Sequence, residues 1–297
     1  MIEFGLIGLL EAAVKLLNTV FGDIGVWLTT APADFAGGGA WDLAESVLES
    51  LKGVGYGLLI LFFLMSFFKT TTDFRKISLQ QTIGWIVRFL LVKVFIDYSL
   101  ELLTTFISLS IGTNNEILGV SGGLGNIVVP PEITQAVTDS IVQEGFWKSA
   151  LASFGNFHLW GLAGIAIAVI FICGIIMVVM VFLRFFKLFI YTAIAPLPLS
   201  TFGNPDTSGI GKHFLKTYAG ACLEICVISL ACALFTAVTN NIANFQIWGS
   251  WSEGQLIDSG SELKILLNFV ITLMIEVVLL TITVSQANKI IKDALGT

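Results

Sequence analysis

Six ionisable side chains lie within long apolar stretches of the sequence, where a charge is costly and is usually kept for a function. Three of them, Lys93, Asp97 and Glu101, fall on one face of a helix, because a step of about 100° per residue spreads them over only about 80°. Such a face points at another helix or at water. The four acids outnumber the two bases, so at least two acids are either protonated or line a wet cavity. The six are Arg88, Lys93, Asp97, Glu101, Glu224 and Glu276.

Several acidic residues are possible partners of Lys93. Asp97 lies four residues further along the same helix, and a rise of about 1.5 Å per residue places Glu224 and Glu276 at depths that Lys93 can reach. Three interpretations of these charges stay open: contacts that hold helices or subunits together, a hydrated translocation path, and a proton relay. The two histidines lie at the edges of the apolar stretches or beyond them, which argues against the relay.

The composition excludes a soluble enzyme, a disordered chain and a basic nucleic-acid-binding domain. Of the 297 residues, 56% are hydrophobic and only 12% are charged, with a mean hydropathy of +0.90. A soluble fold could not bury so much apolar surface, so part of the solvent must be lipid. The four cysteines all lie in apolar runs without a nearby histidine, so we expect no disulfide framework, no metal site and no cofactor.

Five continuous apolar runs are long enough to cross a membrane, for which a helix needs about 20 residues. We therefore predict an all-α, polytopic membrane helical bundle whose transmembrane domain covers residues 53–297. Gly53 and Gly57 open the first run with the spacing of small residues that lets helices approach closely. The predicted spans are residues 53–68, 83–111, 159–183, 218–242 and 265–284.

Residues 1–52 form an amphipathic N-terminal region that we place outside the cytoplasm. Glu11, Lys15 and Asn18 recur at helical spacing in Ile2–Phe21 and make a narrow polar stripe on an otherwise apolar segment. This pattern predicts an amphipathic helix that lies in the interface or packs on the bundle. The alternative is a sixth span.

Lysine and arginine positions orient the predicted bundle, because cytoplasmic loops carry an excess of these bases. Nine bases fall in the loops after the first and third spans and after the last span, against four on the other side. The first group is therefore cytoplasmic, which puts the N-terminus outside and the C-terminus in the cytoplasm.

A basic and aromatic stretch follows the third span and reads RFFKLFIYTAIAPLPLSTFG from Arg184 to Gly203. Arg184 and Lys187 can extend to lipid phosphates. Pro196 and Pro198 predict an extended turn, because proline disfavours a continued helix. The stretch is either a simple connector at the inner interface or a docking surface for a cytoplasmic partner.

This stretch resembles the TrbL-type polytopic inner-membrane proteins of type IV secretion, especially those of conjugative elements in Gram-positive bacteria. The close match covers Arg184–Gly203, and the layout of five spans extends it more loosely over the chain. The resemblance implies a non-enzymatic channel or scaffold subunit in the bacterial cell membrane. Its implied partners are a secretion ATPase, a bitopic assembly factor and further copies of the chain, with the lipid bilayer around them.

The resemblance also implies a transferred substrate, which is single-stranded DNA with an attached relaxase. The acidic outer face would repel a polyanion, so we expect contact with DNA to be indirect or to use the cytoplasmic bases. Two other functions stay open. One is an ion-coupled transporter that uses Asp97, Glu224 and Glu276, and the other is a structural membrane protein of a phage or pilus system.

Overall fold

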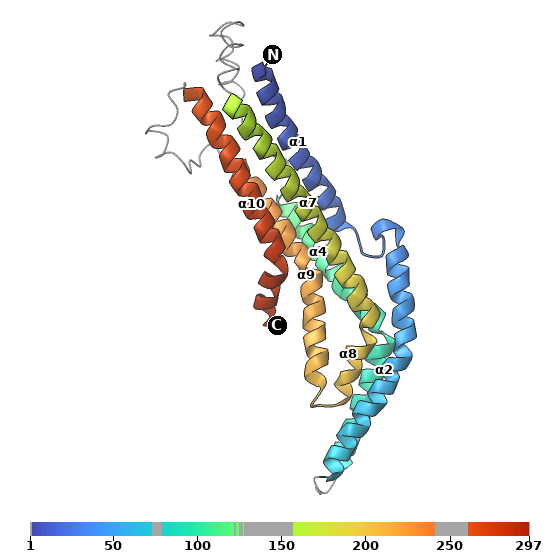
Figure 1. Cartoon of the computed structure of the whole chain (residues 1–297). Helices are drawn as coiled ribbons and strands as arrows, with labels where there is room; N and C mark the ends of the chain where they lie inside the picture. The colour runs from blue at the N-terminus through green and yellow to red at the C-terminus, as the bar shows by residue number, and fades with distance from the viewer. Residues whose placement is uncertain are drawn as a thin grey trace. The chain divides into compact units, whose positions relative to one another are not determined.

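The computed structural model describes residues 2–72, 79–121, 123, 124, 127, 157–240 and 261–296, and the regular elements in these residues are all helical (Figure 1). The predicted all-α fold is confirmed. Two short 3-10 helices, η1 (Phe35–Gly37) and η2 (Thr201–Gly203), lie in connections. The α-helices are α1 (Ile2–Thr29), α2 (Gly39–Thr72), α3 (Leu79–Asp97), α4 (Ser99–Ser121), α7 (Phe157–Ile194), α8 (Pro196–Ser200), α9 (Ser208–Thr239) and α10 (Ser261–Leu295).

Four of the described helices are long and apolar enough to cross a membrane. A helix suits this environment because it satisfies its own backbone hydrogen bonds where water is absent. The four overlap the first, third, fourth and fifth predicted spans, so the chain is a polytopic membrane protein; the identity of the membrane and the orientation stay predictions. The spanning parts are Gly39–Lys69 of α2, Gly164–Ile194 of α7, Ser208–Thr239 of α9 and Val270–Leu295 of α10.

The predicted second span, residues 83–111, forms parts of two helices, α3 and α4, that meet at Tyr98. The backbone N–H of Tyr98 donates to the carbonyl of Val94 at 2.9 Å, and its own carbonyl accepts from Leu102 at 3.0 Å. Helical hydrogen bonding therefore continues through the junction. This segment is not among the four helices above, and its crossing of the membrane stays a prediction. The proposed domain boundary at residue 52 lies inside α2, which runs through it without a break.

The described chain divides into two compact units, which are treated separately below. Unit 1 comprises Met1–Val26, Ile117–Met180 and Ile228–Gln286. Unit 2 comprises Trp27–Glu116, Val181–Val227 and Ala287–Thr297. Helices α1, α4, α7, α9 and α10 each contribute residues to both units.

In unit 1, α1 packs an apolar face on other helices, which is the second of the two arrangements expected for this amphipathic helix. Leu17, Phe21 and Ile24 recur at spacings of four and three residues, and all are buried. The ring of Phe21 lies 5.4 Å from that of Phe235 on α9 in an edge-to-face contact. Glu11 and Lys15 of the predicted polar stripe are exposed.

Asn18, the third polar residue of that stripe, has a structural role in unit 1. Its side-chain amide donates to the carbonyl of Ile127 at 2.9 Å, and its side-chain oxygen accepts from the N–H of the same residue at 3.1 Å. This pair satisfies both backbone groups of Ile127, which is 2% exposed. Asn18 therefore fixes the chain beyond α4 to α1.

In unit 2, α2 and α3 form a helical hairpin (Figure 1). Aromatic side chains join the two helices edge to face, with ring centroids 5.3 Å apart for Phe63 and Phe89 and 5.8 Å apart for Phe67 and Trp85. Such pairs add to the dispersion contacts that hold helices together in lipid, where there is no hydrophobic force between them.

The extended turn predicted at Pro196 and Pro198 is wrong, because both residues lie in the short helix α8. Proline is tolerated in the first turn of a helix, where the missing N–H would have no acceptor in any case. The backbone N–H of Leu199 closes the turn on the carbonyl of Ala195 at 3.2 Å. Pro196 and Leu199 are buried, so α8 is a packed element of unit 2.

Candidate functional site

The main polar cluster of unit 2 joins α7 to α9 through an ion pair that the sequence did not predict. Lys187 on α7 places its ammonium group 3.3 Å from both carboxylate oxygens of Glu224 on α9. The Glu224 side chain is 8% exposed and that of Lys187 is 36% exposed. Glu224 therefore has a basic partner, although not the Lys93 that depth alone had suggested. Lys187 is held by a carboxylate rather than extended to lipid phosphates as expected.

Arg184 lies one turn before Lys187 on α7 and is fully buried. Within the described structure, none of its three guanidinium nitrogens has a hydrogen-bond partner. Its guanidinium carbon lies 5.3 Å from the centre of the Phe185 ring, a cation–π distance. Glu224 of α9 is close enough to act on this charge electrostatically. The sequence prediction that Arg184 reaches lipid phosphates is therefore wrong, because the guanidinium points into the unit.

Tyr218 extends the cluster to a third helix. Its hydroxyl lies 3.3 Å from that of Thr192 on α7 and donates to the backbone carbonyl of Leu103 on α4 at 3.4 Å. About two turns further along α9, the Cys226 thiol donates to the carbonyl of Ser110 on α4 at 3.5 Å. Polar groups from α4, α7 and α9 thus meet in one buried region. A buried tyrosine needs a partner for its hydroxyl, which is the signal by which sequence analysis could have found Tyr218.

The charges predicted on one face of the second span have different surroundings in unit 2. Asp97 accepts a hydrogen bond from the hydroxyl of Tyr56 on α2. Lys93 and Glu101 are exposed, and Arg88 is half-buried. Among the described residues, Lys93 makes no ion pair with Asp97. The predicted ladder is therefore not a buried row of paired charges.

The connection between α7 and α9 packs tightly on α2 in unit 2. A Cβ atom at Gly55 would lie 3.1 Å from both the Cβ and the carbonyl oxygen of Pro196. A Cβ atom at Gly203 would lie 2.8 Å from the Leu59 side chain. At Gly53 and Gly57, the glycines whose spacing had suggested close packing, nothing lies within 4 Å. The close approach therefore uses the intervening Gly55, and the connection is largely covered rather than open for docking.

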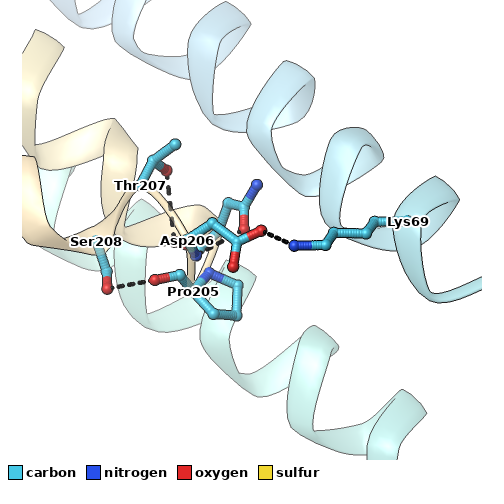
Figure 2. Close-up of polar contacts among 6 residues, drawn as sticks. Lys69, Pro205, Asp206, Thr207 and Ser208 are labelled. Atoms are coloured by element: carbon cyan, nitrogen blue, oxygen red, sulfur yellow. Dashed lines mark hydrogen bonds and ion pairs between the residues drawn. The ribbon is translucent and has the colours of Figure 1, made fainter.

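Figure 2 shows the polar end of this connection, where Lys69 of α2 reaches Asp206 at 2.6 Å. Both side chains are more than half exposed, so this ion pair is screened by solvent. Asn204 is buried, and its side-chain oxygen accepts from the backbone N–H of Asp206 at 3.0 Å. The Ser208 hydroxyl donates to the carbonyl of Pro205 at 2.7 Å at the start of α9 (Figure 2). These local bonds define the turn that leads into α9.

Glu276, the last of the six predicted charges, lies in unit 1 at a groove between α9 and α10. Its Oε2 accepts from the hydroxyl of Thr239 at 2.8 Å, while its buried Oε1 has no hydrogen-bond partner within the described structure. The groove has a volume of about 240 Å³. Its lining residues are Ala231, Leu234, Phe235, Val238, Glu276, Leu279, Leu280 and Thr283. Apart from Glu276 and Thr283, this lining is apolar.

The site was also searched for metal ligands and disulfide bonds. Among the residues that the structure describes, no group of three or more histidine, cysteine, aspartate or glutamate side chains could hold a metal ion. The four cysteines are free. Comparisons of the chain with protein-family models, with curated proteins and with solved structures find no match.

Proposed function

We propose that this chain is a non-enzymatic membrane subunit of a conjugative type IV secretion system. It acts as a scaffold or channel subunit that supports the transfer of single-stranded DNA with its relaxase. The proposal starts from the resemblance of Arg184–Gly203 to the TrbL type. It is consistent with a polytopic helical chain.

The observation that carries the proposal is the position of Arg184–Gly203 within unit 2. The stretch supplies the ion pair to Glu224, the buried Arg184 guanidinium and the Pro196 contact with Gly55. A segment that contacts α2, α3 and α9 through side chains stabilises an arrangement of helices. This is what a scaffold or channel wall requires, whereas a flexible connector would carry few such contacts.

Copurification tests the partners that this function requires. The full chain, tagged at its C-terminus and extracted from donor membranes in mild detergent, is expected to recover the secretion ATPase and the bitopic assembly factor. The Gly55→Leu variant disturbs the packing of unit 2, and it should lose these partners if the packed unit is the binding scaffold. The proposal fails if neither protein is recovered with the wild-type chain under conditions that keep it folded.

A second candidate, an ion-coupled carrier, is favoured by one observation. Of the three acids assigned to it, Asp97 is bound by Tyr56 and Glu224 by Lys187, whereas Glu276 keeps an oxygen without a partner next to a groove. A carrier would show substrate uptake in proteoliposomes that is lost in Glu276→Gln and kept in Glu101→Gln. Uptake that is equal in both variants would exclude a role of Glu276 in transport.

A further inference from the structure

One face of α3 is apolar and uncovered, and a lysine lies at its edge. The exposed fractions of its large apolar side chains run from 48% to 55%. With a step of about 100° per residue they form a continuous stripe, and Lys93 borders it next to Ile86 and Leu90. Lipid could cover the apolar stripe, but it offers no partner to a cation at membrane depth. The stripe consists of Ile83, Ile86, Val87, Leu90, Leu91 and Val94.

The groove at Glu276 has the complementary form. On each helix its lining residues recur at spacings of three and four over about two turns, from Ala231 to Val238 on α9 and from Glu276 to Thr283 on α10. A groove between two such helical faces accepts the side chains of a third helix. Leu234 and Leu279 in the lining are more than half exposed, so the groove is open from the side. Within it, Glu276 offers the unpartnered Oε1 as an acceptor.

We propose that the chain forms a homo-oligomer in which the apolar stripe of α3 on one copy packs into the groove between α9 and α10 of the next copy, with Lys93 donating to Glu276. The charges are opposite, and each lacks an ion-pair partner within the described chain. Counted at about 1.5 Å per residue from the centres of the predicted spans, Lys93 and Glu276 lie about 6 Å and about 2 Å from the midplane on the same side. The extended side chain of a lysine covers this difference.

The contact is heterologous, because it uses different surfaces on the two copies. Such contacts close into a ring when the rotation between copies divides a full turn. A ring would suit the channel subunit proposed above, and the inference rests on that subunit being oligomeric. Its experiments measure contacts between copies and not DNA transfer, so the oligomer and the secretion function can fail independently.

Cross-linking between two differently tagged copies tests the contact. Both copies carry Ser in place of their four cysteines; one then carries Lys93→Cys and the other Glu276→Cys. Oxidation in membranes is expected to give a heterodimer that carries both tags and is lost on reduction. The matched control combines Lys93→Cys with Ile172→Cys, which places the second thiol on an exposed residue of α7 outside the groove. An equal yield from the control overturns the contact, as does the absence of any heterodimer.

A chain that carries both cysteines distinguishes contact within one copy from contact between copies. If the bond forms only within single chains, seen as a faster-migrating monomer, the homo-oligomer contact is wrong. Capture of a different protein by Glu276→Cys, with no heterodimer, would assign the groove to another partner and would also overturn it.

Charge reversal provides a second readout that does not depend on cysteine. Lys93→Glu and Glu276→Lys are each expected to lower the oligomer fraction in detergent about tenfold, since each places like charges opposite one another. The double variant Lys93→Glu/Glu276→Lys restores the pair and should recover most of the oligomer. A role confined to the fold of each copy would show two independent losses and no recovery.

Discussion

The ammonium group of Lys187 on α7 lies 3.3 Å from both carboxylate oxygens of Glu224 on α9. The carboxylate is nearly buried, and the ammonium group of Lys187 offsets part of the cost of removing its charge from water. The pair joins the two helices at the level of the fully buried Arg184, and it belongs to the stretch on which the proposed function rests.

Removing one partner of this pair should destabilise the protein. Lys187→Met leaves Glu224 without a cation and is expected to cost about 1–2 kcal/mol, less than for a fully buried pair because Lys187 is partly exposed. Thermal unfolding in detergent measures the loss. Lys69→Met, which breaks the exposed pair with Asp206, is the control and should change little. Equal losses in the two variants would mean that the Lys187–Glu224 pair is also screened by solvent.

Gly55 should tolerate no side chain, because its Cα faces Pro196. Gly55→Leu would force α2 away from α8 and is expected to lower the melting temperature by several degrees, at a cost of about 1–3 kcal/mol. Gly53→Leu and Gly57→Leu add the same side chain where nothing lies within 4 Å, and both should behave as wild type. If all three variants melt at the same temperature, the close contact between Gly55 and Pro196 does not contribute to stability.

Asn18 should protect the backbone of Ile127 from exchange with solvent. Asn18→Ala removes both hydrogen bonds to that residue, and hydrogen exchange measured by mass spectrometry is expected to speed up at the Ile127 amide by about tenfold. Thr19→Ala removes a hydroxyl that bonds only to the carbonyl of Lys15 within α1, so exchange there should not change. Unaltered protection in Asn18→Ala would contradict the assigned role.

Substitutions at Asn204 and Asp206, which form the turn before α9, should differ in their effect on stability. Asn204→Ala removes a buried acceptor for the N–H of Asp206 and is expected to cost about 1 kcal/mol. Asp206→Asn removes only the exposed ion pair with Lys69, so its melting temperature should stay within error of wild type. A larger loss for Asp206→Asn, measured in the same thermal unfolding assay, would show that the ion pair governs the turn instead.

The sequence predicted those features that depend on one segment at a time. Long apolar runs can only be helices in lipid, so the all-α fold and four helices of spanning length followed from composition and length. The polar stripe of α1 likewise predicted which side of that helix would pack. The interruption at Tyr98 was not predicted from the sequence. In the structure it is slight, since helical hydrogen bonding continues on both sides of Tyr98.

The contacts between segments could not be predicted in the same way. Lys187 and Glu224 lie on different helices, and depth in the membrane alone did not distinguish Lys187 from Lys93 as the partner of Glu224. At Pro196 and Pro198 the general preference of proline for turns gave the wrong answer, since the first turn of a helix accepts both. Which of the glycines in α2 packs closely depended on where Pro196 lies, which is a property of the folded unit.

The two ends of the predicted fourth span report its direction through the membrane. Single cysteines at Ser208 and Ser252, in a chain without its native cysteines, should react with a membrane-impermeant maleimide from opposite sides. Ser252 lies outside the described residues. Labelling of both positions in intact cells would contradict the predicted topology.

DNA transfer from a donor cell tests the central claim most directly. In a donor that lacks the gene, transfer frequency is expected to fall to background, to return with the wild-type chain and with Gly53→Leu, and to stay low with Gly55→Leu. All four strains must grow equally, and each expressed variant must be present in membranes at equal levels. Normal transfer from the donor without the gene would contradict the proposed role in secretion.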